Sequence, residues 1–210
     1  MPHPSSLSAL AQGIRTCQKC PLSQLRLAAV PGEGPGNAEI LFIGEAPGAN
    51  EDRQGRPFVG KSGRLLEKLL ADIHLTREDV FITNIVKCRP PANRDPLPAE
   101  IAACTPWLEQ QIALIDPLLI ITLGRFSMTH FFGPEARITR VHGQPLLQEN
   151  RAIVPMFHPA AALRNPTWKK AMQEDFAAIP GLLAQLRAQK AARAQTDAHP
   201  QQLDLFRPAT

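Results

Sequence analysis

The sequence predicts an α/β domain built around a central parallel sheet. Short apolar runs rich in β-branched residues recur along the chain, and segments with the helical spacing of apolar residues separate them. Strands that alternate with helices form parallel sheets, because each helix carries the chain back to the edge where the next strand begins. The composition agrees with a packed core, since 44% of the 210 residues are hydrophobic and 20% are charged.

Each predicted strand is an apolar run that ends at a turn signal or a polar residue. The strands are expected over residues 39–44, 80–86, 118–124 and 152–157. Helices are expected over residues 62–73, where five apolar residues share one face, and over residues 98–115, which begin with proline. Residues 138–147 are expected to be irregular or a hairpin, and a long helix with a break at Pro180 and Gly181 is expected over residues 167–192.

These elements define one domain over residues 1–190, and we expect residues 191–210 to form a disordered tail, because that end is polar and rich in Pro and Gln. The formal net charge of +4 permits an anionic partner without requiring one. No apolar run is long enough for a membrane span, and the first residues lack the pattern of a signal peptide. We therefore expect a cytoplasmic protein that does not bind membranes.

Four cysteines point to a metal centre. Cys17 and Cys20 form a CxxC pair before a proline, and Cys88 and Cys104 follow much later. Free thiols in a reducing compartment more often bind metal or do redox chemistry than form disulfides. Four thiolates suit either tetrahedral zinc or an iron-sulfur cluster. A redox sensor fits less well, because a thioredoxin-like CxxC opens a helix directly after a strand, whereas Cys17 precedes the first predicted strand. The remaining alternative is four unrelated cysteines in the core.

Polar residues follow three of the predicted strands. Glu45 comes directly after the first strand, Asn84 lies near the end of the second, and His158 follows the fourth. A separate loop between Gly55 and Gly60 carries Phe58. Each residue alone has an ordinary structural explanation as a turn former, a cap or a core residue. Ligands bind outside the carboxyl ends of parallel strands, so the joint placement predicts a site there.

A non-catalytic nucleic-acid-binding protein with structural zinc would explain the cysteines and the basic segment after the second strand equally well. It leaves the three strand-end residues without a role. The segments GEAPGANED, TNIVKCRPP and HPAAALR, together with the cysteine spacing, resemble the iron-sulfur (family 4) uracil-DNA glycosylases of bacteria and archaea. The resemblance extends over residues 17–186, which is most of the chain.

This resemblance implies a uracil-DNA glycosylase-like three-layer α/β fold with a central four-stranded parallel sheet. It also implies that Cys17, Cys20, Cys88 and Cys104 hold a 4Fe-4S cluster rather than zinc. The expected activity is hydrolysis of the N-glycosidic bond of deoxyuridine in single- or double-stranded DNA during base excision repair. No lysine stands among the strand-end residues to form a Schiff base, so we expect a monofunctional glycosylase that leaves the abasic site uncut. We also expect the protein to be a monomer.

The resemblance assigns roles in recognising uracil. His158 would donate a hydrogen bond to uracil O2, where negative charge develops as the bond breaks. Asn84 would pair with O4 and N3–H, an arrangement that opposes the amino group of cytosine. Phe58 would stack on the flipped base.

The loop after the first strand would handle the attacking water. Glu45 and the backbone of Ala46 would line the water side, Gly44 would allow close approach, and Glu51 would help to position water or the sugar. Better-known uracil glycosylases carry a motif similar to GQDPYH, with a water-orienting aspartate where this chain has Ala46, so the group that orients water differs here.

Contacts with DNA are expected on two segments. Lys87, Arg89 and Arg94 lie beside a cysteine and would contact phosphates, and Leu163 and Arg164 would fill the gap left by the flipped base.

In the tail, one apolar pentapeptide resembles the peptides by which bacterial repair proteins bind the sliding clamp; the alternative is a tail that folds back over its own domain. The pentapeptide consists of Gln202, Leu203, Asp204, Leu205 and Phe206.

Overall fold

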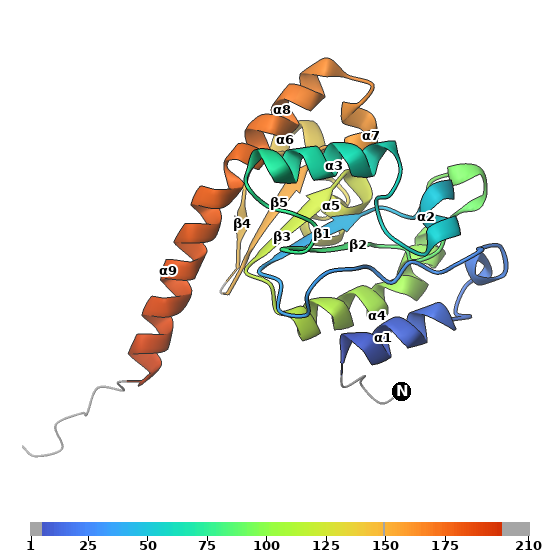
Figure 1. Cartoon of the computed structure of the whole chain (residues 1–210), viewed down its shortest axis with the longest axis horizontal. Helices are drawn as coiled ribbons and strands as arrows, with labels where there is room; N and C mark the ends of the chain where they lie inside the picture. The colour runs from blue at the N-terminus through green and yellow to red at the C-terminus, as the bar shows by residue number, and fades with distance from the viewer. Residues whose placement is uncertain (1–5, 149, 199–210) are drawn as a thin grey trace, which may run out of the picture.

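The structure is a computed structural model, and it describes residues 6–148 and 150–198. It is an α/β fold whose sheet has the strand order β2-β1-β3-β5-β4 (Figure 1). In chain order, the described elements are α1 (Leu7–Arg15), η1 (Pro21–Gln24), β1 (Ile40–Gly44), α2 (Ala49–Gln54), α3 (Lys61–Asp72), β2 (Phe81–Asn84), η2 (Pro91–Asn93), α4 (Pro98–Ile115), β3 (Leu119–Leu123), α5 (Arg125–Phe132), α6 (Ile138–Val141), β4 (Leu146–Leu147), β5 (Ala152–Met156), α7 (Pro159–Ala162), α8 (Pro166–Ala177) and α9 (Ile179–Ala198).

The four predicted strands form the parallel part of the sheet, which confirms the fold class. β1 pairs with β2 and β3, and β3 also pairs with β5, all in parallel register. The sheet has a fifth strand that the prediction of four did not include. This strand, β4, lies in the segment predicted to be irregular and pairs antiparallel with the start of β5. The short strand β4 pairs only with Ala152 and Ile153 of β5. Pro155, which has no N–H group to donate, therefore lies beyond the part of β5 that pairs with β4.

Helices cover both faces of the sheet, as the three-layer prediction requires (Figure 1). On one face, Phe42 of β1 packs with Leu66 of α3 and stacks on Phe176 of α8, with ring centroids 5.8 Å apart. On the other face, Leu41 packs in a cluster that includes Leu108 of α4. Adjacent residues of β1 thus enter opposite cores, which explains why this strand is apolar throughout.

Several helices differ from the sequence-based boundaries. The break in the long C-terminal helix lies at Ala178, between α8 and α9, rather than at Pro180 and Gly181. α9 continues to Ala198, so residues 191–198 of the predicted disordered tail are helical. Helix α1 was not predicted. The pentapeptide at residues 202–206 lies outside the described residues.

No helix within the described part of the chain is both long and apolar enough to cross a membrane.

Candidate active site

A pocket lies at the carboxyl ends of the parallel strands, where the sequence predicted one. It holds about 780 Å³ of space, its open mouth included. The loops after β1 and β5 and the end of β2 supply most of the walls. The structure brings together seven predicted residues here: Glu45, Ala46, Glu51, Phe58, Asn84, Arg94 and His158. The lining residues that sequence reasoning missed are Pro47, Gly48, Ser62, Pro90, Asn93 and Ala160.

Gly44, the last residue of β1, has no room for a side chain. A Cβ atom on Gly44 would lie 2.3 Å from Oδ1 of Asn84 and 2.7 Å from the ring of Phe58. Both distances are far below van der Waals contact. Glycine at this position therefore lets the amide of Asn84 and the ring of Phe58 meet over the strand end.

Asn84 presents a buried acceptor that lacks a partner. The residue is 2% exposed and lines the pocket, and its Oδ1 atom makes no hydrogen bond with any residue in the described ranges. A buried polar atom without a partner costs about 1–3 kcal/mol. Such an atom on a pocket wall suits a ligand that carries an N–H donor.

His158 is held as a neutral hydrogen-bond donor. It caps the N-terminus of α7, and its Nδ1 atom accepts a hydrogen bond from the backbone N–H of Ala160 at 3.1 Å. The proton of the neutral ring therefore resides on Nε2. Burial and, to a smaller extent, the positive charge of Arg164 outweigh the negative charge of Glu51 and lower the pKa of His158 to about 4. At neutral pH the pocket thus receives an uncharged N–H donor.

Phe58 lies against His158 in an unusual backbone conformation. The two ring centroids are 5.7 Å apart and the planes are tilted by 30°. The φ angle of Phe58 is +52°, a left-handed value that costs a residue with a Cβ atom about 1–3 kcal/mol. Helix α3 packs so closely against this residue that a Cβ on Gly63 would lie 1.7 Å from the Phe58 carbonyl oxygen. The surrounding structure therefore fixes the ring.

Glu51 holds the loop that carries Phe58. Its Oε1 atom accepts hydrogen bonds from the backbone N–H groups of Val59 and Gly60, each at 2.9 Å. The sequence predicts that Glu51 positions water or the sugar, and this stays a prediction. The geometry adds a structural role that sequence reasoning did not predict.

Glu45 titrates near neutrality. Burial and, to a smaller extent, the negative charge of Asp95 outweigh the positive charge of Arg125 and raise the pKa of the carboxyl group to about 7. A carboxyl group with such a pKa exchanges protons readily at physiological pH, which is the property that a general base needs.

The residues predicted to contact DNA are placed differently from one another. Arg94 lines the pocket and makes two hydrogen bonds, at 2.9 and 2.6 Å, with the carboxylate of Glu100. Arg89 is half-buried, and Leu163 and Arg164 are exposed at the end of α7. For these four residues, contact with DNA stays a prediction.

The prediction for Lys87 is wrong, because this side chain is buried. It is 1% exposed, and its ammonium group donates to the Thr83 hydroxyl at 2.7 Å, to the Asn84 carbonyl oxygen at 2.6 Å and to the Gln111 side-chain oxygen at 2.6 Å. Three acceptors match the three protons of an ammonium group. Lys87 therefore stabilises the end of β2 from within and cannot reach a phosphate.

The four cysteines line one cavity of about 300 Å³ between α1, α4 and the segment after β2. All four are free thiols. N–H groups surround the sulfur atoms: Arg26 donates to Cys88 at 2.9 Å, the Lys87 backbone to Cys104 at 3.3 Å, and the Trp107 indole to Cys17 at 3.3 Å. Such donors stabilise thiolate sulfur, so the residues fit a group held by four thiolates.

The cavity does not have the arrangement of a single-ion site. Within residues 6–148 and 150–198, no three His, Cys, Asp or Glu side chains converge closely enough to hold one metal ion. A zinc ion requires sulfur ligands at about 2.3 Å from one centre. The CxxC pair follows helix α1 and precedes η1, unlike the strand-then-helix setting of a redox CxxC.

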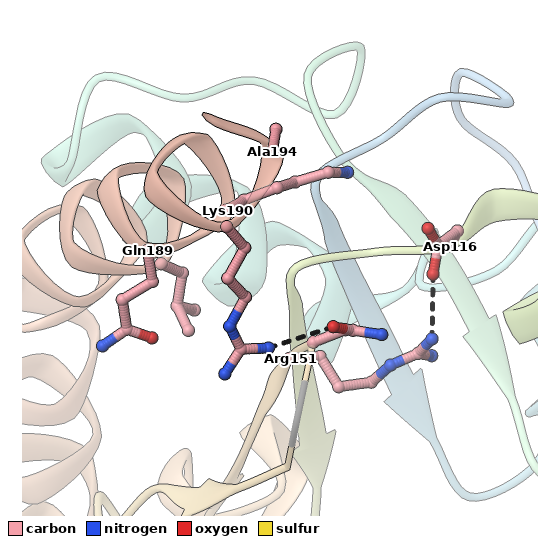
Figure 2. Close-up of a pocket in the computed structure, with 8 residues that line it drawn as sticks. Asp116, Arg151, Gln189, Lys190 and Ala194 are labelled. Carbon is pink, nitrogen blue, oxygen red and sulfur yellow. Dashed lines mark hydrogen bonds and ion pairs between the residues drawn. The ribbon is translucent and has the colours of Figure 1, made fainter. Parts of the chain in front are cut away.

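A second hollow lies at the opposite, amino ends of β3 and β5 and contains none of the predicted site residues. Figure 2 shows that Arg151 donates to Asp116 in this hollow, at 2.9 Å. Arg193 donates to the neutral side chain of Asn150 at 3.1 Å. The pocket at the carboxyl ends therefore remains the candidate active site.

The chain is similar in sequence to known proteins of one family. The family model described as the uracil DNA glycosylase superfamily matches residues 31–179. The chain is 50% identical over 183 residues to a type-4 uracil-DNA glycosylase of Sulfurisphaera tokodaii, with 83% of each chain covered. It is 49% identical over 188 residues to one of Saccharolobus solfataricus, covering 85% of this chain and 87% of the relative. One of Archaeoglobus fulgidus is 42% identical over 182 residues, covering 83% and 92%.

The buried position of Lys87 can be tested by Lys87→Met. The substitution removes the ammonium donor from three buried acceptors, so we expect the free energy of unfolding to fall by about 3 kcal/mol or more in urea titrations. Lys170→Met on α8 is the matched control, since that side chain is 79% exposed, and it should change stability by less than about 0.5 kcal/mol. Equal stability of the two variants would contradict the buried network.

Proposed function

Because this chain belongs to the uracil-DNA glycosylase superfamily, we propose that it excises uracil from DNA by hydrolysing the N-glycosidic bond of deoxyuridine, the first step of base excision repair. The observation that carries the proposal is the unpaired, buried Oδ1 atom of Asn84, a residue that lines the pocket. Uracil supplies what this atom lacks, because its N3–H is a donor directed away from the sugar.

Recognition of the base follows from complementary hydrogen bonds. Asn84 accepts from N3–H through Oδ1 and donates to O4 through its amide NH₂. Cytosine has an acceptor at N3 and a donor at the 4-position, so both of these bonds become repulsive. Phe58 stacks on the ring, worth about 1–3 kcal/mol by comparison with other base–aromatic contacts.

Bond cleavage needs stabilisation of the leaving base and a water molecule. As the bond between C1′ and N1 breaks, negative charge develops on uracil, and the Nε2–H group of His158 donates to O2 where that charge accumulates. Glu45 accepts a proton from the water that attacks C1′. The products are free uracil and an abasic site. No lysine among the lining residues offers an amine for strand cleavage, which supports a monofunctional enzyme.

We further propose that Cys17, Cys20, Cys88 and Cys104 hold a 4Fe-4S cluster. The four cysteines that line one cavity and the donors around their sulfur atoms support this assignment. When bound, the cluster ties the segment after β2 to α1 and α4, and we assign it a structural role. None of the steps above uses it.

DNA approaches the carboxyl face in this proposal. Arg89 and Arg94 contact phosphates, while Leu163 and Arg164 occupy the gap left by the flipped nucleotide. We also propose that the enzyme acts as a monomer. Four free thiols suit a reducing compartment, so we place the enzyme in the cytoplasm.

Excision can be tested with a uracil-containing oligonucleotide, single- or double-stranded. We expect free uracil and an uncut, alkali-labile abasic site, without a covalent adduct after borohydride. Asn84→Leu and His158→Ala should each slow excision by about 10²-fold, as loss of oxyanion donors does elsewhere. Lys170→Met serves as the matched control. Full activity in both pocket variants would place the site elsewhere.

The role of Glu45 predicts a pH dependence. Its carboxylate is the active form, so the rate constant of excision should rise with pH and level off above the pKa of about 7. Glu45→Gln should lower the plateau by about 10²-fold and remove the dependence around pH 7. Single-turnover rates between pH 5 and 9 provide the measurement. A variant that keeps the wild-type profile would exclude Glu45 as the base.

The cluster predicts a brown protein that contains iron and sulfide after anaerobic purification. Cys88→Ala should lose iron and stability, because a missing ligand releases the segment that leads to Cys104. Ser23→Ala, which alters the same cavity without removing a thiol, should keep the iron. Active, colourless protein containing zinc would refute the assignment.

We also propose that residues 202–206 bind the sliding clamp. Leu205 and Phe206 offer apolar anchors, and Gln202 offers a directional amide. A titration with purified clamp should show binding that is lost on deletion of residues 202–206 and retained on deletion of residues 207–210. Unchanged affinity after the first deletion, or no binding by the full chain, would favour a tail that folds back on its own domain.

A further inference from the structure

The loop that carries Phe58 is held by two side chains of opposite charge. Glu51 accepts hydrogen bonds from two N–H groups on one half of the loop, as described above. On the other half, Arg77 donates to the carbonyl oxygen of Pro57 at 2.6 Å and to that of Phe58 at 2.9 Å. A guanidinium group suits this contact, because its rigid fork of donors can bond two acceptors at once.

Arg77 is itself fixed to the strand that ends at Asn84. Its Nε atom donates to Glu33 at 2.8 Å, and Nη2 bonds the same carboxylate oxygen. The backbone of Glu33 exchanges two hydrogen bonds with Ile82 of β2, at 3.0 and 2.8 Å. The connection therefore passes from β2 through Glu33 and Arg77 to the loop of Phe58. It links Phe58, which stacks on the base, to β2, the strand that carries Asn84 and its hydrogen bonds to the base.

The conformation of Phe58 makes this connection consequential. A positive φ angle is unfavourable for a residue with a Cβ atom, so contacts must maintain it. Without Arg77, two adjacent carbonyl groups lose their donors, and the peptide can turn toward an ordinary conformation that moves the ring. We propose that Arg77 is a positioning residue that holds Phe58 in its stacking orientation. This inference rests on the uracil excision proposed above.

Arg56 provides a matched control. It bonds the same Glu33 carboxylate, with Nε at 2.7 Å from Oε2, and its side chain is 57% exposed. Within the described residues, its side-chain hydrogen bonds go to Glu33 and not to the carbonyl groups of the loop. Arg56 belongs to the loop itself, so Arg56→Met removes the loop's own ion pair with Glu33, whose arginine side chain is largely exposed. Arg77→Met also removes a cation from Glu33 and the contact with Glu67 at 3.3 Å, but only this variant removes the donors to the two carbonyl groups of the loop.

The first measurement needs no substrate. The protein is labelled with 4-fluorophenylalanine, and among the signals of its nine phenylalanines the resonance of Phe58 is identified by its loss in Phe58→Leu. Arg77→Met should shift or broaden this fluorine resonance, while Arg56→Met should leave it in place. An unchanged resonance in Arg77→Met would overturn the proposal. Because this readout is independent of activity, it decides the positioning role even if the wild type fails to excise uracil.

The second measurement is inhibition by free uracil. Arg77→Met should weaken inhibition about tenfold, as expected when a base–aromatic stack is disturbed, and Arg56→Met should change it by less than about twofold. In a Phe58→Leu background, Arg77→Met should add less than about twofold, because the ring that it positions is already absent. A further tenfold loss in that background would show that Arg77 acts independently of Phe58 and would overturn the proposal.

Discussion

The ammonium group of Lys87 joins the two chemically distinct regions of this molecule. It bonds the end of β2 and a side chain of α4, while the residues around it include Cys88 and Cys104 of the cysteine cavity. One of its acceptors is the main-chain carbonyl of Asn84. A buried cation is tolerated only while its acceptors stay in place, so the strand end, α4 and the cavity constrain one another. Burial of Lys87 shifts its pKa down to about 8, and the nearby cysteines oppose that shift.

The pocket uses one physical effect for two different purposes. Burial disfavours the charged form of any group, so it lowers the pKa of His158 and raises that of Glu45. The histidine remains a neutral donor, while the carboxyl group stays close to the pH at which it can exchange a proton. Environments that push titratable groups in opposite directions divide the tasks of donor and base between them.

Part of this site was predictable from the sequence. Glu45, Asn84 and His158 follow apolar runs, and the rule for parallel strand ends places such residues together. The burial of Lys87 was not predictable, because a lysine next to arginines has the pattern of a surface cation and its acceptor Gln111 is 24 residues away. The link between Arg77 and Glu33 spans 44 residues and has no periodic pattern. The short strand β4 lacks a pattern of its own and exists because β5 offers it an edge.

In the proposed function, the unpaired acceptor of Asn84 favours binding of uracil at the expense of stability. In the absence of ligand, the atom contributes only its loss of hydration, and an apolar residue of similar size would remove that cost. Selection of variants for heat resistance alone would therefore favour replacement of this asparagine. Engineering for higher thermal stability should keep Asn84 unchanged and place stabilising substitutions in the helical layers, away from the strand ends.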